Sequence, residues 1–249
     1  MDMTQMLGII SGVFFAALFL MCYFRDKLGH TLINTLFVAI DAVLLFCWTY
    51  AGYEVGWLDG GYMTLANISP YICTVIAFCP FLSEKVRSFA YSAIAFLGFG
   101  MFLAMFISPE HEYIFNFRHE VNFVYVTEAA CHLVMSLYGF YLILSNRVKL
   151  TLRNFAKSVI FMYSTVLFAV FLNWVFHKSH FGMGVYGNYS IYFLDIFNSF
   201  GATLAAYLFG ILAVLCLGFA VGMGLDRISA HSAHECTVSE ETAIEEKNK

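Results

Sequence analysis

The stretch NFVYVTEAACHLVMSLYGFYLILS, from Asn122 to Ser145, is apolar and long enough to cross a bilayer as a helix. It carries two ionisable residues near its middle, Glu128 and His132. They are four positions apart, so a helix brings them to one face, one turn from each other. Ionisable groups inside a hydrocarbon span are costly unless they face protein or water, which predicts a functional site turned into a helix bundle. The alternative is a buried contact that only joins two helices.

The whole chain has the composition of a polytopic membrane protein. Of its 249 residues, 61% are hydrophobic and 12% are charged, which is about half the charged share of a soluble domain. Apolar runs of roughly 18 to 25 residues follow one another along the chain. They cover residues 7–24, 31–53, 63–82, 89–107, 122–145, 155–176 and 196–225. We therefore predict an all-α bundle of seven transmembrane helices in residues 1–226, followed by a disordered acidic cytoplasmic tail, residues 227–249.

The distribution of basic residues predicts the orientation. The loops after the first, third and fifth runs, with the start of the tail, hold most of the lysines and arginines of the loops, whereas the opposite loops hold only Arg118 and Lys178. The first group is Arg25, Lys27, Lys85, Arg87, Arg147, Lys149, Arg153 and Arg227. Cytoplasmic loops are enriched in these residues. We therefore expect a multi-pass protein of the cell membrane with its N-terminus outside and its C-terminus inside.

A depth comparison selects a candidate catalytic pair. Counted from Thr64, Cys73 lies about nine residues into its span, and counted from Val121, His132 lies about eleven into its span, so their depths differ by about 3 Å. A thiol beside a histidine becomes a nucleophile, and Glu128 would orient the imidazole. Ser69, one turn before Cys73, is the rival nucleophile, although its hydroxyl would equally serve backbone groups freed at a Pro70 kink. Cysteine is also a common packing residue in apolar helices.

Further polar residues lie near the predicted outer surface. Asn173 and His177 are four apart in the sixth run, and Asn188 precedes the seventh. They would bind a lipid headgroup, or they would only make hydrogen bonds at helix ends. Asp41, inside the second run, is costly there and has no partner that the sequence reveals.

Several function classes are disfavoured. The chain has no phosphate-binding glycine loop and no basic groove, which argues against nucleotide hydrolysis and nucleic-acid binding. The pattern HExxH is absent, so we predict no metal site and no cofactor. The seven cysteines are odd in number and almost all fall in apolar runs, which makes a disulfide framework unexpected. No pair of Gly- or Pro-broken spans points to a secondary transporter.

Five short motifs carry a resemblance to a known family. They are SPYICTVIAF (69–78), GFGMFLAMFISPE (98–110), AACHLVMSLYGFYLIL (129–144), NWVF (173–176) and GNYSIY (187–192). In this order they resemble the YwaF-type integral membrane proteins, over about residues 64–217. Carried over by position, the resemblance implies functional roles for Cys73, His132, Asn173, Trp174, Asn188 and Tyr189. The chain departs from the family pattern around Cys73, where Pro70 or Tyr71 stands in place of a histidine and Thr74 in place of an acid.

The resemblance also implies a chemistry. The family is similar to a mammalian seven-span acyltransferase that remodels ether phospholipids through a cysteine and a histidine. More distantly, it is similar to membrane hydrolases of fatty-acid esters that use a threonine and a histidine. Lipid acyl chemistry, with membrane lipids as partners, is what these similarities imply.

Three hypotheses follow from the sequence. In the first, the protein is a lipid acyltransferase or lipid-ester hydrolase with Cys73, His132 and Glu128 as catalytic residues. Its substrate-binding residues would be Ser69, Asn173, Trp174, His177, Asn188 and Tyr189. In the second, it is a non-catalytic transporter or solute-binding protein whose cavity is lined by Glu128 and His132. In the third, it is a structural membrane subunit whose polar residues only hold helices together.

Overall fold

The structure is a computed structural model that describes residues 3–29, 31–54, 68–107, 123–176 and 199–247. Within these ranges the protein is all-helical, with seven α-helices, two short 3-10 turns and no strand. The helices are α1 (Met3–Tyr23), α2 (Thr31–Glu54), α4 (Ile68–Phe78), α5 (Glu84–Ile107), α6 (Phe123–Leu144), α7 (Leu152–Phe176) and α8 (Phe200–Lys247). The 3-10 turns are η1 (Arg25–Lys27) and η2 (Cys79–Phe81). The predicted all-α class is confirmed.

Six of the described helices are long and apolar enough to cross a membrane. Their apolar parts are Gln5–Tyr23, Thr31–Glu54, Glu84–Ala104, Phe123–Leu144, Leu152–Phe176 and Phe200–Ile228. The chain is therefore a multi-pass membrane protein. The third predicted span differs, because the described helix there is short: α4 ends at Phe78 and the 3-10 turn η2 follows, with Pro80 near its start. Proline lacks the N–H that a continuing helix needs. Seven full spans thus stay a prediction.

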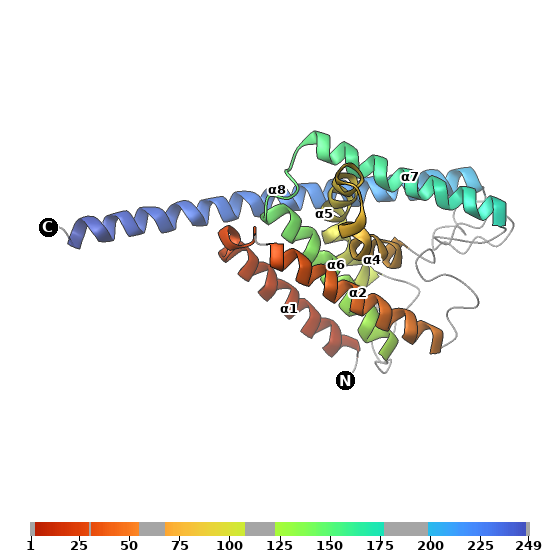
Figure 1. Cartoon of the computed structure of the whole chain (residues 1–249), viewed down its shortest axis with the longest axis horizontal. Helices are drawn as coiled ribbons and strands as arrows, with labels where there is room; N and C mark the ends of the chain where they lie inside the picture. The colour runs from red at the N-terminus through yellow and green to blue at the C-terminus, as the bar shows by residue number, and fades with distance from the viewer. Residues whose placement is uncertain (1–2, 30, 55–67, 108–122, 177–198, 248–249) are drawn as a thin grey trace.

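Helices α5 and α6 form the centre of the bundle (Figure 1). Helix α5 packs against α6, α7 and α8, while α6 also packs against α1 and α2. In the most apolar window of α6, 78% of the residues are buried inside the protein, against 17% in α2. The outer helices α1, α2, α7 and α8 therefore present most of their apolar side chains to the surrounding lipid, as a membrane-spanning helix must.

Glycines allow the central helices to approach closely. A Cβ added at Gly139 of α6 would lie 2.8 Å from the Cα of Gly98 and 2.8 Å from the carbonyl oxygen of Ile94, both on α5. At the other face of α5, a Cβ on Gly218 of α8 would overlap the main-chain oxygen of Phe96. Small residues at helix crossings are the usual means of tight packing in membranes, where no hydrophobic effect drives helices together. These two crossings set how α6 and α8 sit on α5.

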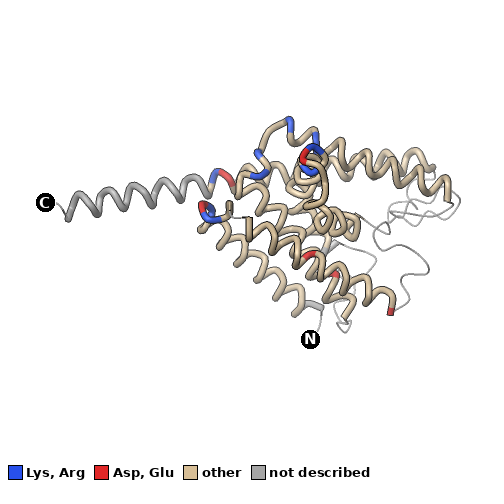
Figure 2. Tube along the Cα trace, viewed as in Figure 1, with Lys and Arg blue, Asp and Glu red and all other residues tan. Residues whose placement is uncertain are grey.

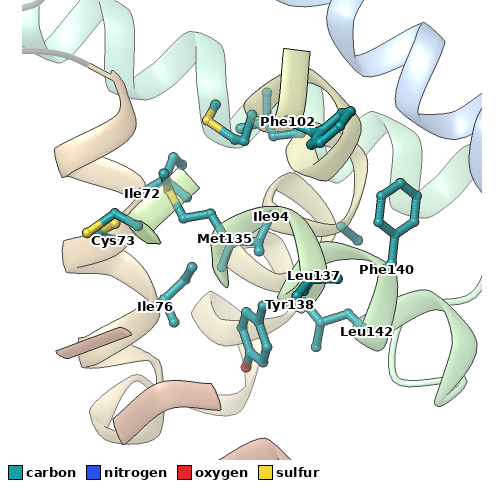
Figure 3. Packing of buried hydrophobic residues seen from close by; sticks show 14 of the residues in the cluster. Ile72, Cys73, Ile76, Ile94, Phe102, Met135, Leu137, Tyr138, Phe140 and Leu142 are labelled. Carbon is teal, nitrogen blue, oxygen red and sulfur yellow. The ribbon is translucent and has the colours of Figure 1, made fainter. Parts of the chain in front are cut away.

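Short helix α4 completes the core beside α6. Figure 3 shows Ile72 and Ile76 of α4 on the side of Met135 of α6, with Cys73 between them along the helix. All four side chains are buried. Helix α4 also packs against α2, so one inner face of α4 meets two neighbours. This contact region, between α2, α4 and α6, holds the candidate site.

The basic residues gather at one end of the bundle, at the turns that join α1 to α2, α4 to α5 and α6 to α7 (Figure 2). At this end Arg25 makes an ion pair of 2.5 Å with Asp226, which fastens the end of α1 to α8. Such an asymmetry is what the positive-inside rule describes. The orientation that it implies, with the N-terminus outside, stays a prediction.

The last helix is longer than the sequence suggests. Disorder is predicted for residues 227–249, whereas α8 continues to Lys247. No glycine or proline follows Gly224 in the sequence to end the helix. Figure 1 shows this part of α8 extending away from the bundle.

Candidate functional site

His132 is held at both ring nitrogens. Its side chain is 5% exposed and lies on α6. Nδ1 is 2.9 Å from the main-chain oxygen of Glu128, one turn earlier on the same helix. Nε2 is 2.9 Å from the hydroxyl oxygen of Ser69 on α4. The histidine therefore links α6 to α4 through a serine hydroxyl.

The main-chain contact determines the tautomer of His132. A carbonyl oxygen only accepts hydrogen bonds, so Nδ1 must carry a hydrogen. In the neutral ring Nε2 then has a lone pair, and the Ser69 hydroxyl donates to it. This is the arrangement that lets a histidine take a proton from a serine.

The Ser69 hydroxyl has a second possible acceptor, the sulfur of Met101. The hydroxyl oxygen lies 3.8 Å from the sulfur of Met101 on α5, within reach of a weak hydrogen bond. If His132 is protonated, Nε2 donates to the Ser69 oxygen and the hydroxyl hydrogen can turn toward Met101. The Ser69 hydroxyl and Nε2 of His132 therefore have hydrogen-bond partners whether His132 is neutral or protonated. A histidine that takes up and releases a proton during catalysis needs this property.

Ser69 does not serve a proline kink. It is the second residue of α4, and Pro70 lies in the first turn of that helix. Proline is tolerated there because the first N–H groups of a helix have no partner within it. The Ser69 side chain is half-buried and points to His132 and Met101 instead of to its own backbone. Of the two nucleophiles that the sequence offered, Ser69 is the one that the structure joins to the histidine.

Glu128 positions His132 through its backbone. The role of its carboxylate in orienting the imidazole stays a prediction, and the structure shows that the carbonyl oxygen of the same residue accepts a hydrogen bond from Nδ1. A contact of this kind follows from helix geometry, which places the carbonyl of one residue near the side chain four positions later. The Glu128 side chain is also buried, at 6% exposure.

Cys73 lies one turn beyond Ser69, in a different contact. It is fully buried, and its electrostatic neighbours are Cys131 of α6 and Asp41 of α2. The interaction with Asp41 falls outside hydrogen-bond geometry. The predicted pairing of Cys73 with His132 stays a prediction. The two pairs, Ser69 with His132 and Cys73 with Cys131, lie in consecutive turns of the α4–α6 contact.

Two further polar groups enter from α2. Asp41 and Trp48 are seven positions apart, so they share one face of the helix, and both are buried. The Trp48 ring lies beside that of His132, with centroids 5.9 Å apart and ring planes at 57°. Sequence reasoning noted Asp41 without a partner and missed Trp48. The seven-residue spacing from a costly aspartate was the signal that would have placed Trp48 on the inner face.

The two other predicted binding residues that the structure describes, Asn173 and Trp174, do not face the same surroundings. Asn173 of α7 is fully buried, whereas Trp174 beside it is 59% exposed, because consecutive residues of a helix point about 100° apart. Trp174 thus faces away from the bundle. The predictions for His177, Asn188 and Tyr189 concern residues outside the described ranges. Helix α4 is joined to α7 by a different contact, a 3.1 Å hydrogen bond between the hydroxyls of Tyr71 and Thr165.

No metal centre is found in the described part of the chain, where no three His, Cys, Asp or Glu side chains are grouped to hold an ion. A bound metal therefore does not explain why Asp41 is buried near the thiols of Cys73 and Cys131.

Asp41 is expected to lower the stability of the fold. Both of its carboxyl oxygens are buried without a hydrogen-bond partner among the described residues. An unsatisfied buried polar group costs about 1–3 kcal/mol, and an apolar residue of similar shape removes that cost. We expect Asp41→Leu to raise the free energy of unfolding by about that amount, measured by thermal unfolding of the purified protein in detergent.

A neighbouring position supplies the control for Asp41. Ala42 lies on the exposed face of α2, so Ala42→Leu should leave the melting temperature unchanged. A lower melting temperature for Asp41→Leu than for the wild type would mean that the carboxyl group has a stabilising partner.

Comparison with protein-family models, with curated proteins and with solved structures finds no match to this chain. The resemblance to the YwaF-type proteins, and the chemistry that it implies, stay predictions. The geometry around His132 is consequently the main guide to function.

Proposed function

We propose that this protein is a membrane-embedded enzyme that transfers the acyl group of a lipid ester, with Ser69 as the nucleophile and His132 as the base. The single observation that supports it most is the 2.9 Å contact between Nε2 of His132 and the Ser69 hydroxyl. Because Nδ1 is committed to a carbonyl oxygen, the free lone pair of the neutral imidazole faces the hydroxyl. A nucleophile, a base and a group that orients the base are the parts that such catalysis requires.

The reaction would proceed in two steps. The Ser69 oxygen attacks the ester carbonyl carbon, and its proton passes to Nε2 of His132. The bond between that carbon and the leaving oxygen then breaks, and His132 returns the proton to the leaving alkoxide. In the second step, water or the hydroxyl of a lysolipid gives its proton to His132 and attacks the carbonyl carbon of the acyl-serine. The bond between that carbon and the Ser69 oxygen then breaks, and His132 returns the proton to the Ser69 oxygen.

The surroundings of the pair favour a lipid as the substrate. Ser69 and His132 lie on helices packed within an apolar bundle, so a substrate would reach them from the membrane. Ser69 also lies at the end of α4 that is opposite the basic turn between α4 and α5. If the basic end faces the cytoplasm, the pair lies in the outer half of the membrane.

The test is covalent labelling of the full chain in detergent with a long-chain alkyl fluorophosphonate, followed by peptide mapping. We expect one adduct, on Ser69, which disappears in Ser69→Ala and persists in Cys73→Ser. Ser136→Ala is a matched control, because Ser136 also lies next to His132 but its hydroxyl is bound to the main-chain oxygen of His132. No adduct, or equal labelling of Ser69→Ala, would overturn the proposed function and leave the solute-binding hypothesis to be tested.

A further inference from the structure

Among the residues that the structure describes, Trp48 is a buried hydrogen-bond donor without an acceptor. Its side chain is 4% exposed, and its indole nitrogen Nε1 has no hydrogen-bond partner among the described residues. Trp174, the other tryptophan in the described ranges, is 59% exposed. An indole N–H that is removed from solvent normally finds an acceptor, because leaving it unsatisfied carries the full desolvation cost. The missing acceptor for the indole N–H of Trp48 points to a ligand that supplies one.

The neighbours of Trp48 show where such a ligand would lie. Its ring is 5.9 Å from the ring of His132, between centroids. Both nitrogens of His132 are engaged, by Ser69 and by the Glu128 carbonyl oxygen, so the imidazole does not take the indole hydrogen. The ring that carries the unused donor therefore lies beside His132, the base of the proposed pair, and it comes from a third helix, α2.

Acyl transfer requires a donor at this place. When Ser69 attacks an ester, the carbonyl oxygen becomes negatively charged, and a fixed N–H that points at it lowers the barrier. A buried donor that nothing else occupies is already desolvated and needs no reorganisation. Trp48 meets these conditions because its ring is held by packing.

We propose that the indole N–H of Trp48 donates a hydrogen bond to the carbonyl oxygen of the lipid ester, and more strongly once that oxygen is negatively charged. The inference rests on the proposed function of the Ser69–His132 pair. It makes Trp48 a catalytic residue and defines the ligand chemistry of the site as an acyl ester with an accessible carbonyl oxygen. An ether-linked chain, which has no such oxygen, would lack this contact.

The experiment compares two variants of α2 in the full chain in mixed micelles, with a chromogenic long-chain acyl ester as the substrate. Trp48→Phe keeps an aromatic ring but removes the N–H. We expect its kcat/KM to fall about 10²- to 10³-fold, with most of the loss in kcat. Phe46→Leu, the control on the exposed face of the same helix, where Phe46 is 73% exposed, should keep the wild-type value. Affinity for the alkyl ether analogue should be the same in all three proteins.

Because phenylalanine is smaller than tryptophan, a second variant separates packing from hydrogen bonding. Benzothienylalanine at position 48 keeps the shape of the indole and replaces the N–H by sulfur, so it should show the same loss as Trp48→Phe. A wild-type rate in that variant, with Ser69→Ala inactive, would overturn the role of Trp48 and leave the proposed function standing. A wild type with no Ser69-dependent turnover would overturn both.

Discussion

Replacement of His132 by alanine is expected to lower the rate of Ser69-dependent ester turnover by about 10²- to 10⁴-fold, the usual contribution of a general base. Without the imidazole, the Ser69 hydroxyl loses the acceptor that lies 2.9 Å away. Only the Met101 sulfur, a weak acceptor 3.8 Å away, remains for its hydrogen. The measurement is kcat and KM for a chromogenic long-chain ester. The loss should fall on kcat, because proton transfer occurs only in the chemical steps.

The control for His132 is the next residue on α6. Leu133 is half-buried and points about 100° away from His132, so Leu133→Ala should retain most of the activity. Thermal unfolding of both variants in detergent distinguishes lost chemistry from lost folding. A His132→Ala protein that folds and turns over the ester at the wild-type rate would remove His132 from the mechanism.

Replacement of Gly218 by alanine is expected to destabilise the protein by about 3 kcal/mol, at the upper end of the cost of overpacking. The added Cβ would overlap the main-chain oxygen of Phe96 on α5. A flexible side chain would turn away from such a clash, but a helix backbone cannot. Helix α8 would therefore have to separate from the central helix α5, which would weaken the packing around Phe96. The free energy of unfolding in detergent is the quantity to measure.

Gly210 provides the matched control, because it lies on the same helix with nothing within 4 Å of an added Cβ. Gly210→Ala should stabilise the protein slightly, by roughly 0.5–1 kcal/mol, since alanine is the better helix former. Opposite signs for the two substitutions would locate the α5–α8 contact. Equal effects would show that α8 does not approach α5 so closely.

Much of the fold follows from local properties of the sequence. The apolar runs predict the membrane helices, because each is long enough to satisfy its own backbone hydrogen bonds across a bilayer. The third run is the exception. A full span is predicted there, but in the described residues the structure has the short helix α4 followed by the 3-10 turn that contains Pro80. The basic turns also gather at one end, as the charge pattern predicts.

The candidate site could be predicted only in part. A histidine inside an apolar span needs a partner, and this requirement singled out His132 from the sequence alone. The depth argument then selected Cys73 and kept Ser69 as the rival nucleophile, since the two are one turn apart on the same helix. The orienting role of the Glu128 side chain stays a prediction, whereas the contact of its main-chain oxygen with Nδ1 of His132 was not foreseen from the sequence.

The sequence by itself therefore determined the all-helical class, six long apolar helices and the presence of buried polar residues on α6, because these depend on the composition and spacing of single segments. Only the tertiary structure decided that His132 meets Ser69, that Cys73 meets Cys131, and that Trp48 of α2 lies against the histidine. Those contacts depend on how each helix is rotated and how closely it crosses its neighbours. Rotation and crossing are set by packing between distant segments, such as Gly139 against Gly98, which the spacing of residues within one helix does not contain.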